Sequence, residues 1–308
     1  MDYSKVIDQE TWAFINRTGD YYPPETATFP VSKQREIYDL MCREFFQGYP
    51  DGVTGETRQV DGVNCRFYAT EATTDVTIMY FHGGGFVVGG LDSHDDVCAE
   101  ICARTGHRVI SVDYRMAPEY HHPAAYDDCQ TVTNWALAHY AGPVVLVGDS
   151  AGGNLAAAVA HASRGGTNRI IGQVLIYPGL GGKMDRGSYL EHAEAPMLTL
   201  QDILFYKGIR CKDGVEPVND PTYAPLHDLD FSALPPSVIV SAGCDPLSDD
   251  GRDYRDALLA AGVPAVWFNE EGLVHGYLRA RTTVQRAARS FDRIIDAISA
   301  LARREWPY

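Results

Sequence analysis

The sequence predicts an α/β fold with a mostly parallel central sheet, helices on both faces of the sheet, and a helical cap. Short apolar runs alternate with amphipathic helical patterns along most of the chain. This alternation is typical of parallel strands that are buried on both faces. Two segments lack it, namely the first 50 residues and a stretch in the second half of the chain. The length of 308 residues suits one large domain with an insertion.

The elements follow from hydrophobic periodicity. Two short amphipathic patterns, around Ile7–Phe14 and Lys33–Phe46, are joined by a connector that contains prolines. Six β-rich runs then predict strands at 76–81, 107–114, 142–148, 170–179, 235–243 and 263–272. Helical patterns lie between them, for example over 93–106, 124–139 and 253–262. The last helix, over about Thr283–Arg303, has one apolar stripe that should face the core.

The segment between the fourth and fifth strands contains helical stretches but no strand–helix unit. We therefore expect it to extend over the edge of the sheet and to join the N-terminal residues in a cap. The predicted segments are the N-terminal part of the cap, the first part of the α/β core, the cap insertion and the second part of the core, at residues 1–50, 51–181, 182–225 and 226–308.

The composition excludes several classes of partner. A net charge of −15 argues against nucleic acid and anionic membranes, because both attract Lys and Arg. Of the seven cysteines only Cys98 and Cys102 stand at helical spacing, which makes a poor metal site, so we expect reduced thiols, no metal and no organic cofactor. The N-terminus resembles no signal peptide, and no apolar run could span a bilayer. We expect a cytoplasmic protein.

Residues at or just past the ends of the predicted strands form a chemically coherent set. In open parallel sheets, sites form at the carboxyl ends of the strands. The residues at these positions are the loop His82-Gly83-Gly84-Gly85 and the side chains of Asp113, Ser150, Asp245 and His275. They provide a nucleophile, a base, an orienting acid and a loop rich in backbone donors.

Ser150 lies in the pattern G-x-S-x-G between a strand and a helix. Glycines at 148 and 152 allow a sharp turn that would hold the serine Oγ above the sheet. A phosphate-binding turn is the alternative, since a helix start also favours anions. It is weaker, because a dinucleotide loop needs further glycines and an acid on the next strand, and a nucleotide loop needs a lysine that is absent here.

His275 follows the last predicted strand and is the candidate base, because a neutral imidazole suits proton abstraction near pH 7. Asp245 follows the fifth strand and could orient that imidazole. Asp249 and Asp250 are rivals for this role, but they stand where a helix should begin and are better interpreted as charges of its first turn. Asp149 precedes the serine, and we expect a structural or electrostatic role for it.

The three glycines after His82 could bring backbone N–H groups close to a ligand. An oxyanion that develops during acyl transfer needs such preorganised donors. A flexible turn is the simpler interpretation, and the matching serine turn argues against it.

Four stretches together resemble one family: "HGGGF" at 82–86, "DYRMAPE" at 113–119, "GDSAGG" at 148–153, and "DPL" with a later "HGY". They are similar to the hormone-sensitive-lipase-like branch of the α/β-hydrolases, the bacterial HGGG esterases, in which the triad has the order Ser, Asp, His. The resemblance extends over essentially the whole chain. It implies a serine esterase for esters of short acyl chains. The enzyme would release the alcohol of the ester first and the acid second, without a cofactor.

The resemblance also implies residue roles. Ser150 would be the nucleophile, His275 the general base and acid, and Asp245 the orienting carboxylate. The oxyanion hole would use backbone N–H groups of Gly84, Gly85 and Ala151, with Gly83 included if the register differs by one. His82 would brace the loop.

Other expectations concern partners and alternatives. The substrate would be a small-molecule ester, and members of the family often associate as homodimers through the sheet edge. An amidase or formamidase on the same fold is an alternative, and a non-catalytic ligand-binding relative is a more distant one. Aromatic residues of the cap are candidate pocket liners, and packing within the cap is the more common role and the alternative for each: Trp12, Phe14, Tyr21, Tyr22, Tyr189, Phe205 and Tyr206.

Overall fold

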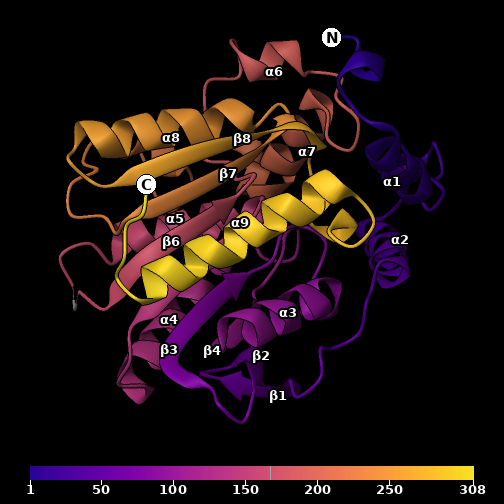
Figure 1. The fold of residues 1–308 in the computed structure, drawn as a ribbon. Coiled ribbons are helices and arrows are strands. Elements are labelled where there is room, and N and C mark those ends of the chain that lie inside the picture. The colour runs from indigo at the N-terminus through magenta and orange to yellow at the C-terminus, as the bar shows by residue number, and fades with distance from the viewer. Residues whose placement is uncertain (167) are drawn as a thin grey trace.

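The computed structural model of the protein describes residues 1–166 and 168–308. The described residues form one eight-stranded sheet with helices on both faces (Figure 1). The strands are β1 (Thr54–Val60), β2 (Val63–Ala69), β3 (Thr74–Phe81), β4 (His107–Asp113), β5 (Val144–Asp149), β6 (Ile170–Ile176), β7 (Ser237–Cys244) and β8 (Ala265–Val274). Their order across the sheet is β1-β2-β4-β3-β5-β6-β7-β8. All neighbours from β4 to β8 are parallel, which confirms the predicted sheet.

The first two strands were not among the six predicted from the sequence. β2 pairs antiparallel with both β1 and β4, so the sheet begins with a hairpin. Its turn is Asp61-Gly62, and both residues have positive φ angles, 47° and 89°. An Asp-Gly pair between two strands is a strong hairpin signal. The apolar pattern missed the hairpin because β1 is exposed along nearly its whole length.

Helices cover both faces of the sheet (Figure 1). Apolar side chains of α3 and α9 pack with one face, and those of α4, α5 and α8 pack with the other. The stripe predicted for the last helix is buried in α9, as expected. The helices are α1 (Gln9–Gly19), α2 (Val31–Glu44), α3 (Asp95–Thr105), α4 (Ala124–His139), α5 (Ala151–Ala162), α6 (Ser188–Glu191), α7 (Leu200–Arg210), α8 (Ser248–Ala260) and α9 (Gln285–Ala302).

Helices from both segments of the predicted cap, the N-terminal residues and the insertion, lie on one side of the molecule. Figure 1 shows α1 and α2, in indigo, on the same side as α7. Tyr38 of α2 and Tyr206 of α7 both pack against Val87 and Val88, which follow the glycine loop after β3. The N-terminal residues and the insertion therefore meet above the carboxyl ends of the strands.

Two further observations concern the chain as a whole. Each of the seven cysteines is buried and free. Within residues 1–166 and 168–308, the helices are too short or too polar to cross a membrane.

Candidate active site

Ser150 lies on the sharp turn between β5 and α5. Its φ of 54° falls in the left-handed region, which is uncommon for a residue with a side chain. The positions two residues before and two residues after Ser150 both require glycine. A Cβ on Gly148 would overlap the carbonyl group of Gly152, and a Cβ on Gly152 would overlap that of Phe81. The sequence therefore folds here into a strained turn that projects the serine side chain from the end of the sheet.

The structure brings Ser150, His275 and Asp245 together from three separate strand ends. His275 Nε2 lies 2.8 Å from Ser150 Oγ, and His275 Nδ1 lies 2.6 Å from Asp245 Oδ2. Asp245 is fully buried, and its other oxygen accepts a hydrogen bond of 2.9 Å from the backbone N–H of Leu247. The carboxylate is thus fixed on one side and presents its second oxygen to the imidazole, an arrangement that can hold the ring in one tautomer.

The carboxylate of Asp149 holds the glycine loop. The backbone N–H of Gly83 donates to Asp149 Oδ1 at 2.9 Å, and the hydroxyl of Tyr80 donates to the same oxygen at 2.8 Å. Asp149 Oδ2 lies 3.3 Å from His94 Nε2 and accepts from Tyr177 at 3.3 Å. Burial alone would raise the pKa of Asp149. The opposing effects of His94, which is the largest of them, of the more distant Arg279 and of Tyr80 outweigh burial and lower this pKa. Asp149 is therefore an ionised anchor for the loop.

Gly84 and Gly85 follow with φ angles of 125° and 61°. A Cβ on Gly84 would overlap the carbonyl of Val88, and a Cβ on Gly85 would stand 2.5 Å from the ring of Tyr206. Within the described part of the chain, the backbone N–H groups of Gly84, Gly85 and Ala151 have no acceptor. The N–H of Gly83, in contrast, is already bound to Asp149.

His82 packs beneath this loop. Its ring stacks on Tyr114 with centroids 4.2 Å apart, and its Nδ1 lies 2.8 Å from the carbonyl oxygen of Gly83. Burial, helped by the neighbouring His94, lowers the pKa of His82 to about 4. His82 is therefore neutral near pH 7 and can brace the loop as a hydrogen-bond donor.

Ser150, His275, Gly84, Gly85 and Ala151 open into one cavity of about 700 Å³. Side chains of α1, α2 and α7 form its walls. Four of the seven predicted aromatic liners do line it: Tyr22, Tyr189, Phe205 and Tyr206.

Trp12, Phe14 and Tyr21 do not line the cavity, because each packs elsewhere, which was the alternative expected for every one of these aromatic residues. Phe14 is buried against Phe45 with ring centroids 5.2 Å apart, and Trp12 packs against the same core. The hydroxyl of Tyr21 donates to Glu44 at 2.6 Å. These contacts depend on how α1 and α2 pack, which local sequence does not encode.

Asp250 has a role that the sequence did not indicate. It belongs to the first turn of α8, as predicted, but it is buried, and one oxygen accepts backbone N–H bonds from Leu180, Gly181 and Gly182 at 2.6, 3.1 and 3.3 Å. Burial raises the pKa of Asp250 to about 6. This carboxylate therefore ties the start of the insertion to α8, where Gly181 and Gly182 line the cavity. Asp113 does not line it.

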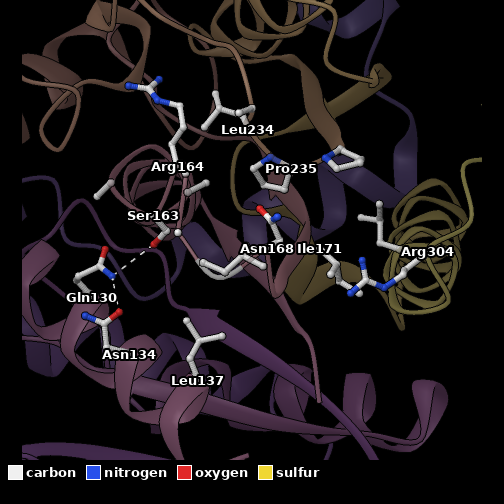
Figure 2. A pocket seen from close by; sticks show the side chains of 18 of the residues that line it. Gln130, Asn134, Leu137, Ser163, Arg164, Asn168, Ile171, Leu234, Pro235 and Arg304 are labelled. Atoms are coloured by element: carbon white, nitrogen blue, oxygen red, sulfur yellow. Dashed lines mark hydrogen bonds between the residues drawn. The ribbon is translucent and has the colours of Figure 1, made fainter. Parts of the chain in front are cut away.

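A second cavity, of about 660 Å³, opens near the opposite ends of the strands (Figure 2). Ile171 at the start of β6, Leu234 and Arg304 contribute to its wall, and Gln130 donates to Ser163 beside it at 3.5 Å. None of the described residues that line it belongs to the predicted site.

Comparisons with known proteins identify the family of the chain. The sequence model of a family described as alpha/beta hydrolase fold matches residues 78–279. Esterase LipI of Mycobacterium tuberculosis is 38% identical over 230 residues, which cover 72% of this chain and 71% of the relative. An arylesterase of Saccharolobus solfataricus is 30% identical over 278 residues, which cover 85% and 90%.

Solved structures show the same likeness. An esterase from the bacterial hormone-sensitive lipase family superposes with a TM-score of 0.86 at 25% identity, covering 96% of this chain and 99% of that one. A Pyrobaculum calidifontis esterase superposes with a TM-score of 0.79 at 30% identity, covering 90% and 95%. The chain therefore belongs to the α/β-hydrolase family, on its branch of esterases similar to hormone-sensitive lipase.

Proposed function

We propose that this protein is a serine carboxylesterase that hydrolyses short-chain acyl esters through an acyl-enzyme on Ser150. The observation that supports this most strongly is the double contact of His275, 2.8 Å from Ser150 Oγ and 2.6 Å from Asp245 Oδ2. A serine hydroxyl becomes a useful nucleophile only when a base accepts its proton, and this imidazole is in hydrogen-bond reach of it.

In the proposed acylation step, Ser150 Oγ forms a bond to the ester carbonyl carbon, and its proton passes to His275 Nε2. The imidazolium is stabilised by Asp245. When the tetrahedral intermediate collapses, the carbon–oxygen bond to the alcohol breaks, and His275 returns the proton to that alcohol. Water then repeats the sequence on the acyl-enzyme and releases the acid and free Ser150.

The oxyanion of each intermediate would accept hydrogen bonds from the backbone N–H groups of Gly84, Gly85 and Ala151. These groups line the cavity and have no other acceptor within the described residues. We leave Gly83 out of the oxyanion hole, because its N–H donates to Asp149. Removal of one such donor typically costs about 3 kcal/mol of transition-state stabilisation.

The proposed cap consists of residues 1–50 and 182–225, and it limits the acyl chain. Tyr206 of the insertion packs directly on Gly85, beside the proposed oxyanion hole, which leaves little space there for a long chain. A homodimer that forms through the free edge of β8 also remains a prediction.

The test is a chain-length series of p-nitrophenyl esters with matched anilides, measured on the wild type and on Ser150→Ala. We expect the highest kcat/KM between acetate and butyrate, slower anilide cleavage, and a loss of about 10⁴- to 10⁶-fold in kcat for the variant. A maximum above about ten acyl carbons would contradict the short-chain assignment, since the cap could then not restrict the chain. Faster anilide cleavage would favour an amidase.

A further inference from the structure

Arg279 is a cation in the wall of the same cavity. It belongs to the short helix Tyr277–Ala280, four residues after His275. Its guanidinium donates to the hydroxyl of Tyr38 and lies over the Tyr38 ring, 5.0 Å from the centroid. Its Nη1 lies 3.6 Å from the position that a Cβ on Gly276 would occupy, so the charge stands close to the residue that follows His275.

The guanidinium has unused hydrogen-bonding capacity. Arginine carries five N–H donors and keeps its charge in proteins. Within residues 1–166 and 168–308, Nε of Arg279 is buried and has no partner, and no Asp or Glu oxygen forms an ion pair with this side chain. Partial burial of a charge without a counter-ion is unfavourable, so this half-buried guanidinium favours an anion beside it.

Arg281, two residues further on, shows how a buried arginine of this fold can be neutralised within the protein. Its Nη2 lies 2.7 Å from Asp96 Oδ2, and its Nε lies 2.7 Å from Glu100 Oε2. Both carboxylates come from the packed face of α3. Arg281 is thus neutralised within the protein, whereas Arg279 faces the cavity without a carboxylate in contact.

The other neighbours of Arg279 do not supply the missing anion. Burial raises the pKa values of Tyr22, Tyr38 and Cys42, so these groups are neutral near pH 7. Asp149 is ionised and acts on Arg279 at a distance, but its oxygens already serve the donors described above. It offsets part of the charge and leaves the guanidinium donors free.

Arg210 is a second arginine in the cavity wall, and its donors are used differently. Its Nη1 donates to the carbonyl of Tyr223 at 3.0 Å, its Nη2 donates to Asn154 Oδ1 at 3.3 Å, and its guanidinium lies 3.6 Å from the centroid of the Phe86 ring. This side chain is held in place by the protein, so it is a weaker candidate for binding an anion.

We propose that Arg279 binds a carboxylate group carried by the ester substrate, so that the site prefers anionic esters over neutral esters of the same shape. This inference rests on the esterase function proposed above. It also explains how an anion could be retained by a protein whose net charge of −15 repels it at long range. The carboxylate can belong either to the acyl part or to the alcohol part of the ester.

The experiment compares isosteric pairs that differ only in charge. For the acyl part the pair is monoethyl glutarate and its neutral amide, ethyl glutaramate. For the alcohol part the pair is 4-acetoxybutanoate and 4-acetoxybutanamide. The value of kcat/KM is measured for each ester, and the ratio of anionic to neutral ester within each pair is the readout, because it cancels effects on the triad.

In the wild type we expect a ratio of at least about 10 in one pair, which identifies the part of the ester that carries the carboxylate. Arg279→Met should lower that ratio at least about tenfold, while Arg279→Lys should keep part of it because the charge remains. Arg289→Met is the matched control, since Arg289 is an exposed arginine of α9 and its loss changes the net charge equally. The control should keep the wild-type ratio.

Several outcomes would overturn the inference and leave the esterase function intact. One is hydrolysis of the neutral esters with no preference for the anionic ester in either pair, and another is a ratio that Arg279→Met does not change. A loss of the ratio in Arg210→Met alone would also overturn the assignment to Arg279. If Arg279→Met does not fold, Tyr38→Phe replaces it, because the Tyr38 hydroxyl holds the guanidinium in position and its loss should lower the ratio. Hydrolysis of the p-nitrophenyl esters but of none of these four esters would also overturn the inference, whereas failure on all of them would refute the esterase proposal itself.

Discussion

Replacement of Asp149 by asparagine should separate the anchoring of the glycine loop from the chemistry on Ser150. The carboxylate binds the Gly83 N–H at 2.9 Å and the Tyr80 hydroxyl at 2.8 Å through one oxygen, and it faces His94 and Tyr177 at 3.3 Å with the other. Asparagine keeps one acceptor oxygen and loses the second. Hydrogen bonds to a charged group contribute about 1.5–3 kcal/mol each, and the two lost here are long, so the free energy of unfolding should fall by about 3 kcal/mol.

The effect on catalysis follows from the weaker bond to Gly83. A neutral acceptor binds an N–H about half as strongly as a carboxylate does, so the loop should hold Gly84 and Gly85 less firmly. Because a fully lost oxyanion donor costs about 10²- to 10³-fold in kcat, a misplaced one should cost about 10- to 100-fold, with KM little changed. Steady-state hydrolysis of p-nitrophenyl butyrate gives kcat and KM, and urea unfolding gives the stability.

Tyr80→Phe is the matched control for this experiment. It removes one hydroxyl from the same carboxylate oxygen and leaves the bond from Gly83 in place. Its stability should fall by about 1.5 kcal/mol, the lower end of the range for a hydrogen bond to a charged group, and its kcat should stay within about threefold of the wild type. The reasoning would be refuted by folded Asp149→Asn protein whose kcat also stays within about threefold of the wild type.

Asp245→Asn should lower kcat by about 10³- to 10⁴-fold, the effect known from the serine protease triad, because the amide no longer fixes the tautomer of His275; a loss below about tenfold in steady-state assays would contradict this role. The pKa of His82 falls from 6.5 to about 4 on folding. Its contribution to stability is therefore complete above about pH 6.5 and is lost as the pH falls toward 4, by about 3 kcal/mol. The free energy of urea unfolding should therefore fall less between pH 6.5 and pH 4 in His82→Gln than in the wild type, by this amount. The same decrease in both proteins would argue against a neutral buried His82. Gly84→Ala should abolish most ester hydrolysis, since its Cβ would overlap the backbone carbonyl of Val88. A folded variant with full activity would contradict the described conformation of the glycine loop, and crystallography or hydrogen exchange of that variant would show how the loop differs.

The main residues of the candidate site could be predicted from the sequence, because they depend on short-range patterns. Ser150 lies in a glycine turn between a strand and a helix, and the ends of parallel strands necessarily meet at one edge of the sheet. Asp245 and His275 follow two of those strands, so their proximity to Ser150 could be expected before any coordinates. The role of Asp149 was anticipated only in general terms, since its partners come from other elements.

Tertiary packing decided what the sequence could not provide. Whether Phe14 or Tyr22 lines the cavity depends on how α1 and α2 rotate against the core. Asp250 and Arg279 carry no local signal, because a charged residue in a helical pattern is normally exposed, and only the folded chain shows which charges are buried. The β1–β2 hairpin, in contrast, could have been predicted, since the Asp-Gly pair of its turn is a local sequence signal.

The most direct test of the account is the covalent modification of Ser150 by a p-nitrophenyl phosphonate, followed by intact-mass measurement and peptide mapping. We expect one adduct per chain on Ser150, formed rapidly in the wild type and much more slowly in His275→Ala, because the imidazole activates the hydroxyl. An unmodified wild-type protein, or an adduct that also forms in Ser150→Ala, would contradict the claim that this serine is the nucleophile.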